Sequence, residues 1–147
     1  MAYVPKEAHW FLAALVEEIR VEGAKRNVVH INHVLVEASC PEEAYRRAVE
    51  LGQESASEYV NTSGNKVSTR FRGLRNLDVI HDPLEHGCEV AFQEKLGVSE
   101  QGIQKLIRAK HELEVFCPIR HRRGRPDYAS KEIMDEVHRK LSVPNEP

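Results

Sequence analysis

NHVLVEASCPEEAYRRAVELG, residues 32–52, joins an alternating apolar run to a helix with a marked start. The run begins at residue 28. Because strand side chains alternate, Val29, Ile31 and Leu35 share one face, and further valines occupy the other. The pattern predicts a strand over residues 28–38.

The helix that follows is predicted from its first turn. Ser39 can cap free backbone N–H groups, Glu42 can reach back towards it, and Pro41 is tolerated at a helix start. Apolar residues then recur at helical spacing towards Tyr59. We expect a helix over residues 41–59 with one apolar stripe.

Residues 10–21, upstream of this stretch, are apolar at nearly every position before Glu17 and predict another strand, although a short helix fits the same run. Residues 23–27 suit a hairpin turn. Both predicted strands are apolar on both faces. Such strands are typical of the centre of a sheet, or of a sheet whose second face is covered by a helix or a partner subunit.

Downstream of the helix, residues 66–72 alternate cleanly and predict a third strand, with Gly73 as a bulge or bend. Residues 88–95 predict a fourth strand, and Ser99 the start of a second helix. The expected class is α+β, with a mainly antiparallel four-stranded sheet in ββαββα order and the first helix on one face. Residues 1–117 form one domain; residues 118–147 are a basic linker and an extra C-terminal helix.

Several short motifs in this order resemble a known bacterial family. They are Val34-Leu-Val-Glu-Ala38, Glu43-Ala44-Tyr45, Gly73-Leu74 and Gly87-x-Glu89-Val90. The chain is similar to the family known as domain of unknown function 4288 over roughly residues 10–116. The resemblance implies no established activity, cofactor or catalytic residue.

Composition limits the class of protein. The 147 residues carry a net charge of -2, with 41% hydrophobic and 30% charged residues, as in an ordinary globular protein. Three cysteines without CxxC spacing indicate neither a disulfide framework nor a zinc ribbon. The longest apolar run is far shorter than a membrane-spanning helix, and no signal peptide is evident. We expect a cytoplasmic protein without a membrane partner.

The C-terminal segment is the basic part of the chain and contains an Arg-Gly-Arg-Pro core. Residues 118–147 carry 7 Lys+Arg against 5 Asp+Glu. Such a core resembles an AT-hook, in which glycine lets the backbone approach the minor groove and arginines seek its negative potential. The same residues also suit a solvated linker. The candidate DNA-binding residues are Arg120, Arg122, Arg123, Gly124 and Arg125.

Two further clusters contain residue types that bind metals or anions. His81, His86 and Cys88 are types that ligate first-row metals, although their spacing matches no zinc module and also suits a polar connection. On the third strand, Lys66, Arg70 and Arg72 could extend a basic surface or form a solvated sheet face.

Catalytic motifs such as a nucleophile elbow, a phosphate-binding loop or a His-Glu-x-x-His helix are absent from the sequence. We therefore expect a non-enzymatic interaction module that takes no cofactor and self-associates as a homodimer or larger oligomer, with a further protein partner of unknown identity. One alternative is a weak DNA-binding accessory protein that uses the Arg-Gly-Arg-Pro tail. A metal-dependent enzyme is a third hypothesis.

Overall fold

A computed structural model describes residues 4–118 and 125–142. The chain divides into two compact units. The first contains residues up to Val90 together with the segment from Pro126, and the second runs from Ala91 to Arg125. In the described parts, no helix is both long and apolar enough to cross a membrane.

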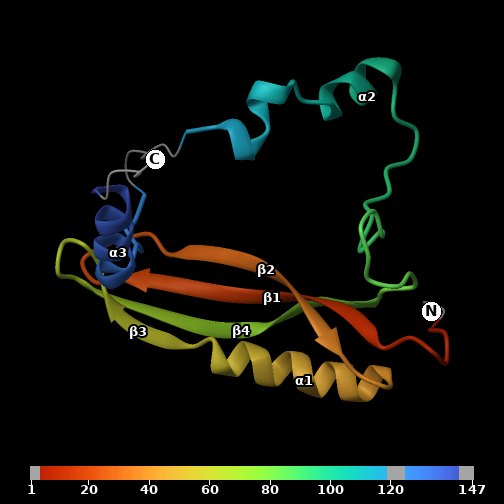
Figure 1. Ribbon diagram of the computed structural model, residues 1–147, viewed down its shortest axis with the longest axis horizontal. Coiled ribbons are helices and arrows are strands. Elements are labelled where there is room, and N and C mark those ends of the chain that lie inside the picture. The colour runs from red at the N-terminus through yellow and green to blue at the C-terminus, as the bar shows by residue number, and fades with distance from the viewer. Residues whose placement is uncertain (1–3, 119–124, 143–147) are drawn as a thin grey trace, which may run out of the picture. The chain divides into compact units, whose positions relative to one another are not determined.

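The first unit is built on a four-stranded antiparallel sheet (Figure 1). Its strands are β1 (Trp10–Val21), β2 (Val28–Glu37), β3 (Ser57–Val60) and β4 (Lys66–Val79), in the spatial order β2-β1-β4-β3. The expected α+β class is confirmed. Strand β1 is central, as its two apolar faces predicted, whereas β2 lies at an edge.

One helix, α1 (Pro41–Glu54), packs against one face of this sheet. Ala44 and Ala48 are fully buried on it. They pack against odd-numbered β1 residues, including Phe11 and Leu15. Small residues on the helix allow this close approach. At Gly52, an added Cβ would lie 2.5 Å from ring atoms of Phe71.

The start of α1 differs from the predicted capping pattern. Cys40 is the N-cap residue, and its side chain makes no capping hydrogen bond. Ser39 instead donates to the Glu43 carboxylate at 2.6 Å. This hydrogen bond, with the Arg47 guanidinium at 2.9 Å, lowers the pKa of Glu43. The helix start is therefore ordered by side chains one turn apart, and Pro41 occupies its first turn as expected.

Strand β4 is longer than predicted because it continues through Gly73. The pairing with β1 shifts register twice, between Ala14 and Leu15 and between Val16 and Glu17. Gly73 has a φ of 141°, which disfavours any side chain. Gly73 itself pairs with Val16, and bulges at Arg72 and Arg75, on either side of the glycine where the sequence suggested one, let the strand bend without ending.

The ββαββα order is matched only in part, because two segments were assigned wrongly. Residues 55–59 were expected in the helix, but α1 ends at Glu54 and β3 begins at Ser57. Residues 88–95 were expected as a strand and form none. The short strand β3 pairs with β4 from Ser57 opposite Thr69 to Val60 opposite Lys66, and so occupies the sheet edge.

The segment after Pro126 packs on the opposite end of the same sheet face. Tyr128 contacts the cluster of Ile19, Val21 and Val67, and its ring meets His30 edge-on at 5.2 Å. Asn61, almost fully buried, donates to the Asp127 carbonyl at 3.0 Å. Helix α3 (Lys131–Ser142) follows, and lies within residues 118–147, where an extra C-terminal helix was expected. Helix α1 and this segment therefore divide one sheet face between them.

The second unit has little packed core. Its helix α2 (Glu100–Leu106) begins at Ser99, whose hydroxyl accepts from the Gly102 N–H at 3.1 Å, which confirms the predicted cap. Two short 3-10 helices follow, η1 (Lys110–Glu112) and η2 (Glu114–Phe116). Within residues 91–118 no side chain is buried.

Contact between α1 and Phe71 generates a testable prediction. Gly52→Ala should lower the free energy of unfolding by about 1–2 kcal/mol, because steric overlap outweighs the ~1 kcal/mol that alanine contributes in a helix. Urea denaturation measures the change. Gln53→Ala, at the exposed neighbouring position, should stay within about 0.5 kcal/mol of wild type. An unchanged or raised stability of Gly52→Ala would contradict this packing.

Candidate functional site

The sheet face opposite α1, here called the open face, carries an apolar patch. Because Leu12 pairs with Leu35 and Val16 with Ile31, these four residues share that face. Val29 extends the row. Val29, Ile31 and Leu35 on β2 are 54%, 44% and 47% exposed, so no described part of the first unit covers them. We define the apolar patch as Leu12, Val16, Val29, Ile31 and Leu35.

The same strand leaves one side of its backbone without a strand partner. Among the described residues, strand β2 pairs only with β1, and Figure 1 shows it along the margin of the sheet. It contains ten residues with no proline or lysine to block pairing. The other edge strand, β3, has four residues, and its Glu58 pairs with Lys66 at 3.3 Å. The two edges therefore differ in their capacity to accept another strand.

A charged cluster occupies the other end of the open face, around Glu18. Residue Glu18 is 8% exposed, and its side chain 11%. It accepts from the Asn27 amide at 2.6 Å and pairs with Arg20 at 3.1 Å and Arg72 at 3.2 Å. The Asn27 hydrogen bond, together with both guanidinium groups, lowers the pKa of Glu18. The carboxylate stays charged and holds two arginine side chains on the open face.

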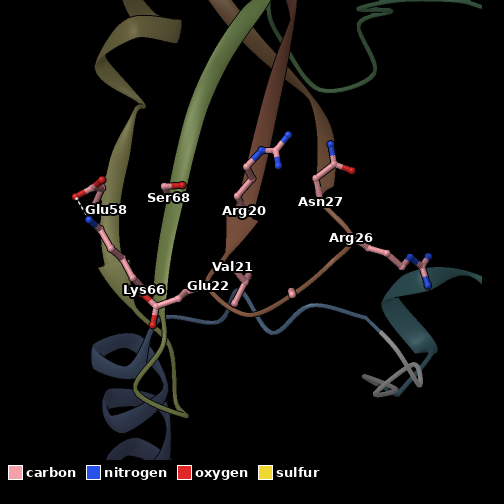
Figure 2. A pocket seen from close by; sticks show the side chains of 9 residues that line it. Arg20, Val21, Glu22, Arg26, Asn27, Glu58, Lys66 and Ser68 are labelled. Carbon is pink, nitrogen blue, oxygen red and sulfur yellow. Dashed lines mark ion pairs between the residues drawn. The ribbon is translucent and has the colours of Figure 1, made fainter.

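A polar hollow of about 300 Å³ adjoins this cluster. Figure 2 shows Ser68 between two walls, with Lys66 paired to Glu58 on one side and Arg20 and Asn27 on the other. Arg26 and Glu22 also line it. The lining includes no aromatic side chain. Its donors suit an anionic group, although both acidic side chains oppose one.

His81, His86 and Cys88 lie in the connection after β4 and are not brought together as metal ligands. The two histidines are exposed and Cys88 is half-buried. Among the described residues, no three His, Cys, Asp or Glu side chains are grouped as a metal site requires. The geometry therefore gives the metal hypothesis no ligand set.

The candidate DNA-binding residues Arg120, Arg122, Arg123 and Gly124 lie outside the described residues. Arg125 is described and exposed. The Arg-Gly-Arg-Pro hypothesis therefore stays a prediction. On the third predicted strand, by contrast, Arg70 and Arg72 lie exposed beside Glu18.

Sequence reasoning missed the central part of this cluster, Glu18. Its neighbour Glu17 points to the other face of the strand, where it accepts from Asn32 at 2.7 Å on the α1 side. A carboxylate within an apolar strand was the available signal, because such a group needs partners when buried. Its partners come from a turn and a distant strand, so no local pattern reveals them.

Depression of the Glu18 pKa predicts how stability depends on pH. A lowered folded-state pKa stabilises the protein above the unfolded value, about 4.3, and the effect is lost as pH falls through the folded value. The unfolding free energy of Glu18→Gln should therefore approach that of wild type as pH decreases below about 4.3. Chemical denaturation across this range measures the difference.

Glu22→Gln is the matched control, since its exposed side chain makes no ion pair among the described residues. It should retain the pH dependence of wild type. If Glu18→Gln also retained the wild-type pH dependence of the unfolding free energy, the ionised Glu18 cluster would contribute nothing to folding.

The sheet unit corresponds to a recognised family domain. The model of the family described as Domain of unknown function (DUF4288) matches residues 10–92, which is more than half of the chain and less than the expected residues 10–116. The match therefore ends where the first unit gives way to the second near Val90.

One similar protein is Alanine--tRNA ligase of Prochlorococcus marinus subsp. pastoris, which is 31% identical over 81 residues. That stretch is 55% of this chain and 9% of the ligase, so the chain spans a small part of that protein. No solved structure matches the chain. From the family match over residues 10–92, the chain belongs to the DUF4288 family.

Proposed function

We propose that this protein is a non-enzymatic interaction module that self-associates through the β2 edge and the apolar patch. The observation that carries the proposal is the combination of both features on one strand. Val29, Ile31 and Leu35 are about half exposed on a ten-residue strand that has a partner on one side only. Such an edge is a ready template for another strand.

A second copy suits this edge because antiparallel pairing of β2 with itself creates a two-fold interface. Each copy then supplies the same residues to the other. A register that sets odd-numbered residues opposite odd-numbered ones keeps Val29, Ile31 and Leu35 on one continuous face. The two apolar patches then adjoin and shield each other in part.

The second edge of the sheet favours a closed dimer over a fibre. Strand β3 has only four residues, with Glu58 and Lys66 paired across it. Short, charged edges resist further pairing. Once two β2 strands have paired, neither copy presents a long unpaired edge, so a third copy does not add to the dimer.

Typical free energies indicate that the apolar patch and the unpaired β2 edge are both needed for two copies to associate. Covering the exposed part of each of the three β2 side chains contributes about 1 kcal/mol, or ~6 kcal/mol for two copies. The loss of translational and rotational freedom costs about 4–15 kcal/mol. Apolar burial alone is therefore insufficient, and inter-strand hydrogen bonds must add to it. We expect dissociation in roughly the micromolar range.

The similarity to Alanine--tRNA ligase covers 81 residues and 9% of that protein, a length within the range of a single small domain. Within the described residues of this chain, we infer docking as the activity because the open face supplies an apolar surface and an unpaired strand edge.

Self-association predicts a mass in solution of twice the 16.8 kDa of one chain. Sedimentation equilibrium at about a hundred times the expected micromolar dissociation constant should approach this mass, because more than about nine-tenths of the chains are then paired. Ile31→Asp should give the mass of a single chain, because a carboxylate at the paired edge would be desolvated.

Ile133→Asp provides a matched control, since Ile133 is 61% exposed on α3, outside the apolar patch. This variant should remain dimeric. Wild-type protein that stays monomeric, or two variants that dissociate equally, would refute the proposed interface.

A further inference from the structure

Three arginine side chains gather at the charged end of the open face. Arg70 on β4 is paired directly with Glu18 on β1, so the two residues share a face. Arg72 and Arg20 each lie two residues along from this pair, and both contact Glu18. We call Arg20, Arg70 and Arg72 the arginine cluster.

The cluster carries excess positive charge. Glu18 supplies one carboxylate for three guanidinium groups. Arg70 has no ion-pair partner among the described residues, and neither has Arg26 at the rim of the hollow. The cluster is therefore locally cationic on a chain whose net charge is -2. An anionic partner is the complement to such a surface.

Pre-ordering distinguishes this cluster from scattered surface arginines. The buried Glu18 carboxylate holds the guanidinium groups of Arg20 and Arg72 in place through ion pairs. The side chains of the two arginines remain 71% and 50% exposed. Guanidinium groups held in this way lose less freedom on binding and offer forked donors that fit phosphate oxygens. A register shift in β4 between Phe71 and Gly73 leaves Arg72 without a residue directly opposite it.

We propose that the arginine cluster binds the phosphate backbone of a nucleic acid. The backbones of Arg20 and Arg72 lie on opposite sides of the Glu18–Arg70 pair, each about 6.8 Å away along its strand, so the three arginines start from a diagonal row across β1 and β4. A line of cations suits a chain of phosphates. Without an aromatic side chain in the adjoining hollow, bases find no stacking platform there. Binding is therefore to the backbone and independent of sequence.

This site does not depend on self-association, because it lies on β1 and β4 rather than on the β2 edge. It also differs from the Arg-Gly-Arg-Pro tail. The two sources of basic charge are separable by mutation.

Fluorescence anisotropy with a labelled, mixed-sequence DNA duplex of roughly 20 base pairs tests the proposal, at salt from about 50 to 200 mM. The full-length chain should bind, with log affinity falling linearly against log salt. The double variant Arg20→Ala, Arg70→Ala should bind more weakly. Its slope should be shallower by about 0.9 for each lost phosphate contact, or about 1.8 in all.

Two control variants distinguish binding by the arginine cluster from an effect of net charge and from misfolding. Arg46→Ala, Arg139→Ala removes the same charge from exposed positions on α1 and α3 and should leave the slope unchanged. Arg70→Gln alone removes a side chain without an ion pair, so the fold should persist while the slope falls by about 0.9.

The proposal is overturned if wild type fails to bind at about 50 mM salt, or if the control double variant weakens binding equally. It is also overturned if only Arg125→Ala abolishes binding, which would assign binding to the tail. Competition by poly-glutamate as effective as unlabelled duplex at equal charge would likewise overturn it, because the surface would then recognise any acidic polymer.

Discussion

Packing of α1 on one face of the sheet is the interaction on which the rest of the structure depends. Ala44 and Ala48 bring the helix close to Phe11 and Leu15, and Gly52 accommodates the Phe71 ring. The helix is too short to cover the whole face. Tyr128 and the chain around it cover the remaining end, over Ile19, Val21 and Val67. The second face receives no such cover from the described residues of the first unit.

The side chains that β1 places on the open face change from apolar to charged along the strand, and so define two parts of that face. Its even-numbered residues are apolar from Trp10 to Val16 and then become Glu18 and Arg20. Cross-strand neighbours follow this division in part: Ile31 and Leu35 lie beside the apolar half and Arg70 beside the charged half, whereas Val29 lies opposite Glu18. Proximity to the β2 edge makes the apolar half suitable for a second copy. The charged half is suited to an anion.

Alternation along the chain predicted the long strands well, because half-buried strands need apolar residues at every second position. It failed for β3, whose Ser57 and Glu58 are exposed and whose Tyr59 continued the helical stripe. It also failed at residues 88–95, where alternation occurs without a strand partner. Pairing is a property of the assembled sheet, so short segments cannot be assigned from local pattern alone.

The site was predictable only in part for the same physical reason. Exposed Val29, Ile31 and Leu35 follow from a strand that is apolar on both faces, and the sequence indicated a partner or a covering helix there. The Glu18 cluster joins β1 to Asn27 and to Arg72, 54 residues away. Such convergence depends on the register between β1 and β4, which two bulges alter.

Amide hydrogen exchange along β2, measured by NMR at high and low protein concentration, tests the central claim most directly. Amides of β2 that point away from β1 have no strand partner in the described part of one chain. Pairing of two copies predicts that they are protected at high concentration and exchange rapidly on dilution, while amides facing β1 stay protected throughout. Rapid exchange of the outward amides at every concentration would contradict the account.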